Sequence, residues 1–319
     1  MPNQDFIPFV FAGPALDRLA IQRKDAAWLE SMLHAAETCF VPVCDEQNIV
    51  IGQKEHSTPF LLQKEIAGSL VDDADCAVLL GEYQGRTCFA LGLSRTFELP
   101  DDAAFTNLRP QFGVMENEAL ALLGYARAMV HWHLQHRFCG HCGHATESRS
   151  AGHELHCPQC GNVIYPRINP AIIVLVSHSE RCLLGHQSAW DAHRYSTIAG
   201  FVEPGEDLES AVRREVFEET NIRIGALRYQ HSQPWPYPAS LMLGFQAEAL
   251  NTDIHCNDGE LLDARWFSRD ELLNELERGS LTLPTRQSIS YRLLREWFEQ
   301  AGGHYTAAAL AAASRKQPA

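Results

Sequence analysis

The stretch from residue 200 to residue 222 reads GFVEPGEDLESAVRREVFEETNI, and it constrains the fold of this chain more than any other. It opens with a turn containing glycine and proline. It then predicts a helix, because apolar residues recur at helical spacing on one side. Glu215, Glu218 and Glu219 lie within four positions of one another, so three carboxylates crowd the last turns. Oxygen ligands of this kind suit a hard divalent cation that bridges to substrate phosphates. A solvated acidic helix face is the alternative interpretation.

The spacing of the residues around these glutamates favours the cation site. The stretch resembles the Nudix hydrolase box, G-x5-E-x7-R-E-U-x-E-E-x-G-U, in which U is aliphatic. The matching residues are Gly200, Glu206, Arg214, Glu215, Val216, Glu218, Glu219 and Ile222. Asn221 stands where the family has Gly. That Gly ends the helix in a left-handed conformation, for which Asn is the next most tolerant residue.

Length and composition place the chain among globular proteins of two or three domains. It has 319 residues, of which 45% are hydrophobic and 21% charged. The net charge of −14 argues against a broad nucleic-acid or anionic-membrane surface. The sequence shows neither a secretory signal nor an apolar run long enough to span a bilayer. Six cysteines are scattered and are interpreted as buried thiols: Cys39, Cys44, Cys76, Cys88, Cys182 and Cys256. A reducing, cytoplasmic location is expected.

Residues 1–125 predict an N-terminal α+β domain whose purpose the residues themselves do not indicate. Residues 21–36 have helical periodicity, and the apolar runs 77–82 and 87–93 predict a β-hairpin. Arg109, in a Leu-Arg-Pro sequence, is either a phosphate ligand or an ordinary surface residue.

Residues 126–165 predict the end of a helix followed by a zinc ribbon. The helix, expected over 118–135, runs into FCGHCG at 138–143, and CPQCG follows at 157–161. Two Cys-x2-Cys pairs are typical of a tetrahedral zinc site, with Cys139, Cys142, Cys157 and Cys160 as ligands. Two disulfides, a catalytic dithiol, or a set of three cysteines and one histidine are the alternatives. A site with four protein ligands has no vacancy for water, so this metal is expected to stabilise the fold. Between Cys139 and Cys160 only Arg149 is strongly cationic, which argues against a nucleic-acid-binding ribbon.

Residues 166–300 predict a third domain, an α/β/α sandwich of mixed sheet around the glutamate-rich helix. Strands are expected at 172–176, 182–184, 195–202, 241–249 and 264–267, and helices at 269–278 and 287–300. Residues 301–319 form an Ala-rich tail, expected to be a frayed helix or disordered.

The segment SQPWPYPAS at 232–240 narrows the resemblance. Its alternating prolines predict a rigid loop outside the strand ladder. The loop would either hold aromatic rings out for stacking or pack them on the core. It resembles SQPWPFPxS, the signature of the NADH pyrophosphatase subfamily of Nudix enzymes, with Tyr237 in place of Phe. Glu260 in ELLDARWF, the ribbon sequence FCGHCG and the late segment LPTRQSISYRLL fit the same subfamily.

The resemblance implies hydrolysis of the pyrophosphate of NAD(H) to nicotinamide mononucleotide and AMP, with Mg²⁺ or Mn²⁺ as the catalytic metal. It implies as metal ligands the Ala199 carbonyl and the carboxylates of Glu215, Glu218, Glu219 and Glu260. Glu219 is the candidate for activating water, and Arg214 is expected to orient the glutamates. The implied substrate-binding residues are Tyr165, Phe201, Gln233, Pro234, Trp235, Pro236, Tyr237, Pro238, Ala239 and Ser240, with Ser290 and Arg109 as weaker additions.

The subfamily also implies a homodimer and removal of NAD caps from RNA 5′ ends. Nothing in the residues distinguishes NADH, NAD and NAD-capped RNA as substrates. Two other functions stay open: hydrolysis of another nucleoside diphosphate such as ADP-ribose or a dinucleoside polyphosphate, and nucleotide sensing by a non-enzymatic zinc-ribbon protein. The intact SQPWPYPAS loop weighs against the first, and the presence of all four glutamates weighs against the second.

Overall fold

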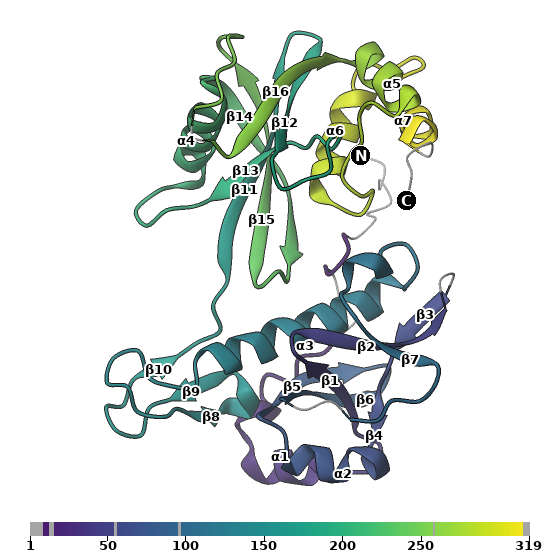
Figure 1. Cartoon of the computed structure of the whole chain (residues 1–319). Coiled ribbons are helices and arrows are strands. Elements are labelled where there is room, and N and C mark those ends of the chain that lie inside the picture. Colours follow the sequence, from purple (N-terminus) through teal and green to yellow (C-terminus); the bar gives the residue numbers. More distant parts are fainter. Residues whose placement is uncertain (1–8, 13–15, 54–55, 95–96, 258, 315–319) are drawn as a thin grey trace. The chain divides into compact units, whose positions relative to one another are not determined.

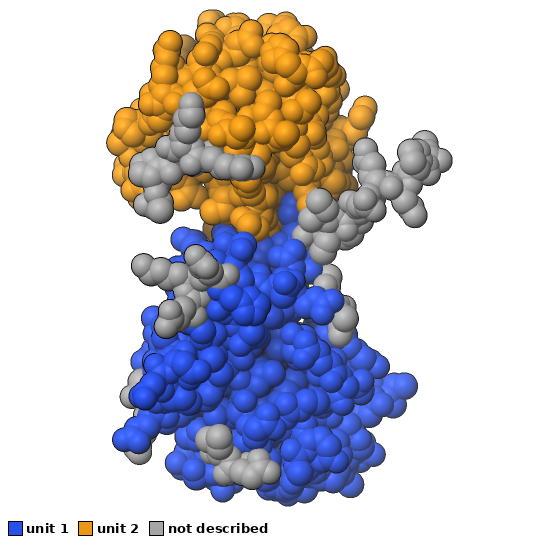
Figure 2. All heavy atoms as spheres, turned by 90° about the vertical axis from the view of Figure 1, so that its right-hand side faces the viewer, with its two compact units in different colours: residues 1–168, 235–239 blue, residues 169–234, 240–319 orange. Residues whose placement is uncertain are grey.

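A computed structural model describes residues 9–12, 16–53, 56–94, 97–257 and 259–314. The chain divides into two compact units, which Figure 2 colours separately. Unit 1 comprises Met1–Ile168 and Trp235–Ala239, and unit 2 comprises Asn169–Pro234 and Ser240–Ala319. No helix within the described ranges has the length and apolar character needed to cross a membrane.

Unit 1 is built on a sheet with the strand order β3-β2-β1-β6-β5, in which β4 pairs with β1 and β7 with β2. The strands are β1 (Cys39–Cys44), β2 (Gln47–Gln53), β3 (His56–Pro59), β4 (Leu62–Gln63), β5 (Cys76–Tyr83), β6 (Arg86–Leu93) and β7 (Ala103–Thr106). The hairpin predicted at 77–93 is confirmed as β5 and β6. The pair β1 and β6 is parallel.

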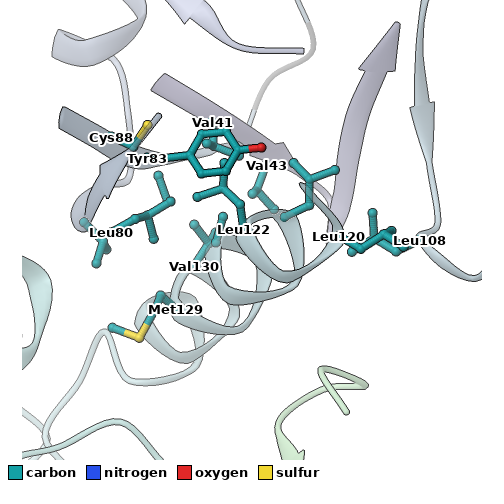
Figure 3. Close-up of a cluster of buried hydrophobic side chains, with 14 of the residues drawn as sticks. Val41, Val43, Leu80, Tyr83, Cys88, Leu108, Leu120, Leu122, Met129 and Val130 are labelled. Carbon is teal, nitrogen blue, oxygen red and sulfur yellow. The ribbon is translucent and has the colours of Figure 1, made fainter. Parts of the chain in front are cut away.

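Helix α3 (Asn117–Gln135) covers one face of this sheet, and it confirms the helix predicted at 118–135. In Figure 3, Leu122 and Val130 of α3 lie near Val41 and Leu80 of the strands, and Leu120 lies beside Leu108. A second cluster of buried apolar residues includes Phe40 and Phe89 of the strands. Side chains of α1 (Ala26–Leu33) and α2 (Lys64–Asp72) pack against it. The sheet of unit 1 therefore has an apolar cluster on each face.

Two predictions for unit 1 are corrected by the structure. The helix expected over 21–36 is shorter and broken, because Asp25 separates the short 3-10 helix η1 (Gln22–Lys24) from α1. The Asp25 side chain accepts a hydrogen bond from Trp28 N at 3.0 Å, which caps α1. Cys39 and Cys88 are not free thiols. The parallel register of β1 and β6 places them opposite each other, with Cα atoms 4.9 Å apart, and they form a disulfide.

The zinc-ribbon segment of unit 1 is a small antiparallel sheet that follows α3. Its strands are β8 (Glu147–Arg149), β9 (Glu154–His156) and β10 (Val163–Ile164), in the order β10-β9-β8. The 3-10 turn η3 (Ser150–Gly152) joins β8 to β9. Gly143 and Gly161 follow the second cysteine of each pair and have φ of 76° and 73°, which L side chains rarely adopt.

Unit 2 is an α/β/α sandwich with a mixed sheet, which confirms the predicted architecture. The sheet has the order β14-β15-β11-β12-β16, and β13 pairs with β11. Its strands are β11 (Asn169–His178), β12 (Arg181–Gln187), β13 (Ile198–Phe201), β14 (Ile224–Trp235), β15 (Ser240–Ala249) and β16 (Leu261–Ser268). Helix α4 (Leu208–Thr220) packs on β13 and β11, whereas α5 (Arg269–Arg278), α6 (Ile289–Glu299) and α7 (Ala307–Ser314) lie on the other side in Figure 1.

Three further expectations differ from the structure. The segment 232–240 is not wholly outside the ladder, because β14 continues through Trp235 and only the next four residues form the turn. The tail contains α7, and Leu310 on this helix is fully buried, so the described part of the segment packs on the domain rather than fraying. Cys256 is exposed and not buried as expected, since it lies in the irregular segment between β15 and β16.

Candidate active site

Helix α4 carries most of the predicted site, and its two ends are set by local sequence. Asp207 caps the first turn, where its carboxylate accepts a hydrogen bond from Ser210 N at 2.7 Å. Asn221 ends the helix with φ of 62°, the left-handed conformation expected at this position. Val212 and Val216 are fully buried against the sheet. Because one side of the helix is fixed in the core, the glutamates on its last turns are presented in a defined direction.

Arg214 ties two of these glutamates to Glu206, which precedes the helix. Its Nε donates to Glu206 Oε1 at 2.6 Å, and Nη1 donates to Glu215 Oε1 at 2.9 Å and to Glu218 Oε2 at 3.1 Å. Nη2 donates to the Phe201 carbonyl at 2.9 Å, which joins the helix to β13. The planar guanidinium fork suits such a set of acceptors. An orienting role of Arg214 would use these contacts, and it stays a prediction.

The electrostatic effect of this arrangement differs between the two carboxylates that contact Arg214 most closely. Hydrogen bonds from Arg214, and then from the Glu203 backbone N–H, lower the pKa of Glu206 to about 2. Burial raises the pKa of Glu215, against the lowering effect of Arg214, and the charges of Glu218 and Glu260 raise it further. Glu215 therefore lies within a local excess of negative charge, which a cation would relieve.

Gly200 lies so close to Glu215 that any side chain at this position would collide with the Glu215 carboxylate. A Cβ built at this position would lie 2.0 Å from the carboxylate carbon of Glu215 and 2.2 Å from both of its oxygens. The backbone of β13 and the Glu215 carboxylate are therefore in direct contact. Ala199, whose carbonyl is an implied metal ligand, precedes Gly200 on this strand, opposite Ile173 of β11.

The other three implied ligands differ in exposure. Glu219 is 2% exposed, whereas the side chain of Glu218 is 52% exposed. Glu260 is also exposed, and its charge acts on Glu215. Among the described residues, the four cysteines are the one group of three or more candidate ligands that could hold a metal ion, and their ligand atoms lie within 4.8 Å of one another. The carboxylates are thus gathered around α4 and Arg214 without forming a closed ligand set. Their oxygen donors fit a hard divalent cation that retains waters.

The four cysteines of unit 1 meet at the ribbon knuckles. The Sγ atoms of Cys139 and Cys160 are 3.7 Å apart, and those of Cys142 and Cys157 are 3.4 Å apart. Tetrahedral zinc with Zn–S bonds of about 2.3 Å requires sulfur separations of roughly 3.8 Å. Backbone N–H groups of His141 and Cys142 lower the pKa of the Cys139 thiol to about 6. A backbone hydrogen bond lowers the pKa of Cys160, but burial and the three neighbouring thiols outweigh it and raise this pKa to about 12. The cluster fits a structural zinc ion.

Five of the implied substrate-binding residues lie in unit 2: Phe201, Gln233, Pro234, Ser240 and Ser290. Phe201 is 59% exposed and stands open to a ligand. Gln233 is fully buried, where its Nε2 donates to the Gln287 carbonyl at 3.0 Å and its Oε1 accepts from Ile289 N at 2.7 Å. Ser290 is buried with its Oγ 2.8 Å from Thr197 Oγ1. Gln233 and Ser290 thus make internal contacts that join α6 to the sheet.

The remaining implied substrate residues lie in unit 1. Tyr165 is 64% exposed. Trp235 and Tyr237 pack into an aromatic cluster with Phe11 and Phe112, at ring-centroid separations of 5.4–6.1 Å. The Arg109 guanidinium lies 4.6 Å from the centre of the Tyr237 ring. Within this unit the loop is therefore held by aromatic packing.

Comparisons with known proteins decide the family. Residues 166–286 match the NUDIX domain, residues 37–132 match the NADH pyrophosphatase-like rudimentary NUDIX domain, and residues 134–165 match the NADH pyrophosphatase zinc ribbon domain. A protein of Stutzerimonas stutzeri (strain A1501) named NAD-capped RNA hydrolase NudC is 40% identical over 215 residues, which are 67% of this chain and 75% of that protein. This chain is a Nudix hydrolase of the NADH pyrophosphatase type.

Two other proteins are similar to this chain. The Homo sapiens protein named NAD-capped RNA hydrolase NUDT12 is 38% identical over 195 residues, which are 57% of this chain and only 42% of that protein. A crystal structure of a NUDIX hydrolase from Nitrosomonas europaea has a TM-score of 0.42 and 21% identity, over 52% of this chain and 93% of that chain.

Arg127 contacts the aromatic loop and was not among the residues predicted from the sequence. Arg127 of α3 is buried, and its Nε donates to the Pro236 carbonyl at 3.2 Å. Its Nη2 pairs with Glu46 Oε2 at 3.1 Å, and its guanidinium lies 5.2 Å from the centre of the Tyr237 ring. A lone arginine within an otherwise apolar helical stretch, ALALLGYARAMV, was the available signal.

Proposed function

We propose that this Nudix hydrolase cleaves the pyrophosphate of NAD(H) to nicotinamide mononucleotide and AMP. The observation that carries the proposal is the set of glutamates gathered by Arg214 on α4 beside Gly200. The similarity over 67% of the chain to a protein named NAD-capped RNA hydrolase supports the choice of substrate. Removal of NAD caps from RNA 5′ ends belongs to the same proposal, because the same pyrophosphate bond would be cleaved.

The residues of α4 and its neighbouring segments would have distinct roles in this reaction. Glu215, Glu218, Glu219 and Glu260, with the Ala199 carbonyl, would hold Mg²⁺ or Mn²⁺. When bound, such an ion neutralises charge on the phosphoryl oxygens and makes a coordinated water more acidic. Glu219 would accept the proton from the attacking water, since it is the most buried of these carboxylates. Arg214 would hold Glu206, Glu215 and Glu218 in place and would not contact substrate.

The nucleoside halves would be recognised by exposed aromatic rings. Phe201 and Tyr165 are 59% and 64% exposed, so their faces are open to stacking. Trp235 is half-buried in its aromatic cluster and would offer only part of its ring. Gln233 and Ser290 would act indirectly, because their polar atoms bond within the domain.

We also propose that the enzyme is a cytoplasmic homodimer. Eight of the ten cysteines are free thiols, the four of the ribbon among them, which favours a reducing compartment in spite of the Cys39–Cys88 disulfide. Several large apolar side chains of unit 1 are exposed on or beside the ribbon, which is typical of a protein–protein contact. These are Phe138, Val163, Tyr165 and Ile168. Light scattering of the purified protein would give the mass of about two chains if the proposal holds and of one chain if it does not.

A substrate panel tests the function. NADH, NAD, an NAD-capped RNA, ADP-ribose and a dinucleoside polyphosphate would each be incubated with Mg²⁺ or Mn²⁺, and the products separated by chromatography. We expect the highest kcat/KM for NADH, NAD or the capped RNA. A higher kcat/KM for ADP-ribose or the dinucleoside polyphosphate would replace this substrate assignment. Absence of turnover with every substrate would favour a nucleotide sensor.

The variant Trp235→Ala tests whether Trp235 contacts the substrate or only packs within the aromatic cluster. Stacking of a ring on an aromatic side chain contributes about 1–3 kcal/mol, or roughly five- to a hundred-fold in affinity. If the exposed part of Trp235 stacks on the nicotinamide, KM for NADH should rise within this range while KM for ADP-ribose changes less. Equal losses for both substrates would assign Trp235 to the aromatic cluster alone.

A further inference from the structure

Unit 1 contains a cavity of about 490 Å³ that the proposed reaction does not use. It lies between the N-terminal elements η1 and α1 on one side and the ribbon elements β8 and η3 on the other. Its volume is within the range of small-molecule sites, which is about 300–1,000 Å³. None of the implied metal or substrate residues lines it.

Cationic residues line this cavity from both sides. Arg23 and Lys24 of η1 and Arg149 at the end of β8 contribute three positive charges, against one acidic lining residue, Glu154. The chain as a whole has a net charge of −14, so this is a local reversal of sign. The charges are weakly engaged within the described residues. Arg23 donates only its Nε, to the Arg18 carbonyl at 2.9 Å, and the single ion pair of Arg149, to Glu147, is 3.9 Å long and exposed.

The ribbon side of the cavity is a fixed and unusual turn. Ser150, Ala151 and Gly152 have φ of 49°, 55° and 89°, and such left-handed residues cluster at ligand-binding positions. Two histidines fix the turn: His133 Nε2 donates to the Gly152 carbonyl at 2.8 Å, and His153 Nε2 donates to the Leu79 carbonyl at 2.8 Å. A Cβ at Gly152 would lie 2.9–3.0 Å from Val78, so the turn also packs directly on β5.

Apolar side chains also line the cavity, among them Leu29 and Leu33 of α1 and Phe89 of β6. A ligand that satisfies both the cationic and the apolar residues combines a strongly anionic group with a compact apolar body. A phosphomonoester carries about −1.5 to −2 charges and three acceptor oxygens, which matches three cations better than a single carboxylate does. The apolar side chains and the volume suit a base and ribose.

We propose that this cavity is a binding site for a phosphorylated nucleoside, with the phosphate between Arg23, Lys24 and Arg149 and the nucleoside against Leu29, Leu33 and Phe89. Such a ligand has two sources, a free mononucleotide and the 5′ end of an RNA chain. The proposed hydrolysis itself releases two mononucleotides. The site is built without the glutamates of α4, so it can be tested independently of the reaction.

The test is photolabelling with 8-azido-AMP, followed by peptide mapping, on the intact chain. We expect labelled peptides from residues 22–33 or 147–154, in addition to any label in unit 2. Arg149→Gln and Lys24→Gln should each lower this label about tenfold, because each removes one charge-assisted contact. Arg137→Gln, which removes an exposed charge of the same unit outside the cavity, should leave it unchanged. Zinc content and melting temperature of each variant show that the fold is intact.

Competing ligands identify the recognised chemistry and its source. Unlabelled AMP should displace the label at lower concentration than adenosine or inorganic phosphate, because each of these lacks one half of the ligand. Stronger displacement by a 5′-phosphorylated RNA octamer than by AMP would assign the site to RNA ends. No label in 22–33 or 147–154, label insensitive to Arg149→Gln and Lys24→Gln, or displacement by adenosine equal to that by AMP would overturn the proposal.

Discussion

At the scale of single residues, the site depends on one arginine and one glycine. Arg214 hydrogen-bonds to three carboxylates and to the backbone of β13, so like charges that would repel one another share a cation. Gly200 allows the Glu215 carboxylate to rest against that strand. Both residues belong to the Nudix box, and their contacts give a physical reason for the spacing of that motif.

Gly200→Ala tests this close contact. The added Cβ would lie 2.0 Å from the Glu215 carboxylate carbon, so Glu215 must move by about an ångström or more. Displacements of this size at a catalytic site lower turnover by about 10²-fold. We expect kcat for NADH to fall by that order while the melting temperature changes little, as measured by steady-state kinetics and calorimetry.

Gly68→Ala is the matched control for this prediction. Gly68 lies in helix α2, and a Cβ there would have no atom within 4 Å. Alanine in a helix is more stable than glycine by roughly 0.5–1 kcal/mol, so this variant should melt slightly higher with unchanged kcat. If Gly200→Ala kept full activity, Glu215 would not need its position against β13.

At the scale of elements, the spacing of its cysteines predicts the zinc ribbon. The zinc ion would have four protein ligands and no site for water or substrate, so we expect it to stabilise the fold and not to take part in the reaction. Cys139→Ser should remove one ligand of the zinc site and release about one zinc ion per chain. Because apparent zinc binding energies of roughly 10–16 kcal/mol stabilise only the folded ribbon, loss of soluble protein should precede any specific change in kinetics. Elemental analysis of the wild-type protein should find one zinc per chain. Protein that is folded and active without zinc would contradict the assignment.

The turn η3 makes a separate prediction about pH. Burial lowers the pKa of His153 to about 4, and this outweighs its hydrogen bond to the Leu79 carbonyl. In the unfolded chain the pKa is about 6.5, so below that pH the unfolded state binds more protons. The stabilising contribution of neutral His153 is therefore complete above about pH 6.5 and is lost as the pH falls towards 4.

Melting temperatures of the wild-type protein and of His153→Gln at pH 7.5, 6 and 5 measure this effect. The wild-type value should fall more steeply than that of the variant, whose amide does not titrate and can still donate to Leu79. His56→Gln, at an exposed histidine of the same unit, should follow the wild-type curve. Parallel curves for His153→Gln and the wild type would show that His153 is not protonated on unfolding.

Elements with a strong local signal could be predicted from the sequence, and contacts between distant segments could not. Apolar residues at helical spacing predict α3 and α4, and the paired cysteines predict the ribbon. The Cys39–Cys88 disulfide depends on a parallel register between β1 and β6, which lie 49 residues apart in sequence. The candidate site residues of α4 come from a motif that fixes their spacing, and their roles stay predictions. Gln233 and Ser290 are buried because α6 packs against the sheet at these residues. This packing joins distant segments, so no local sequence pattern predicts it.

At the scale of the whole molecule, the chain passes between its two compact units after residues 168, 234 and 239. The glutamates lie in unit 2, whereas the zinc cysteines, the turn 236–239 and the cationic cavity lie in unit 1. The charge distribution is uneven on the same scale. A protein of net charge −14 that acts on a dianionic dinucleotide needs cations at the reacting phosphates, which the proposed Mg²⁺ or Mn²⁺ would supply.

The most direct test of this account is product formation from NADH by the wild-type protein and by Glu219→Gln, each treated with a chelator and then given Mg²⁺ or Mn²⁺. The wild-type protein should release equal amounts of AMP and reduced nicotinamide mononucleotide only after the ion is restored. Glu219→Gln, which keeps the shape of the side chain, should retain its fold and be slower by on the order of 10² or more. Equal rates for the two proteins, or cleavage at any bond other than the pyrophosphate, would contradict the account.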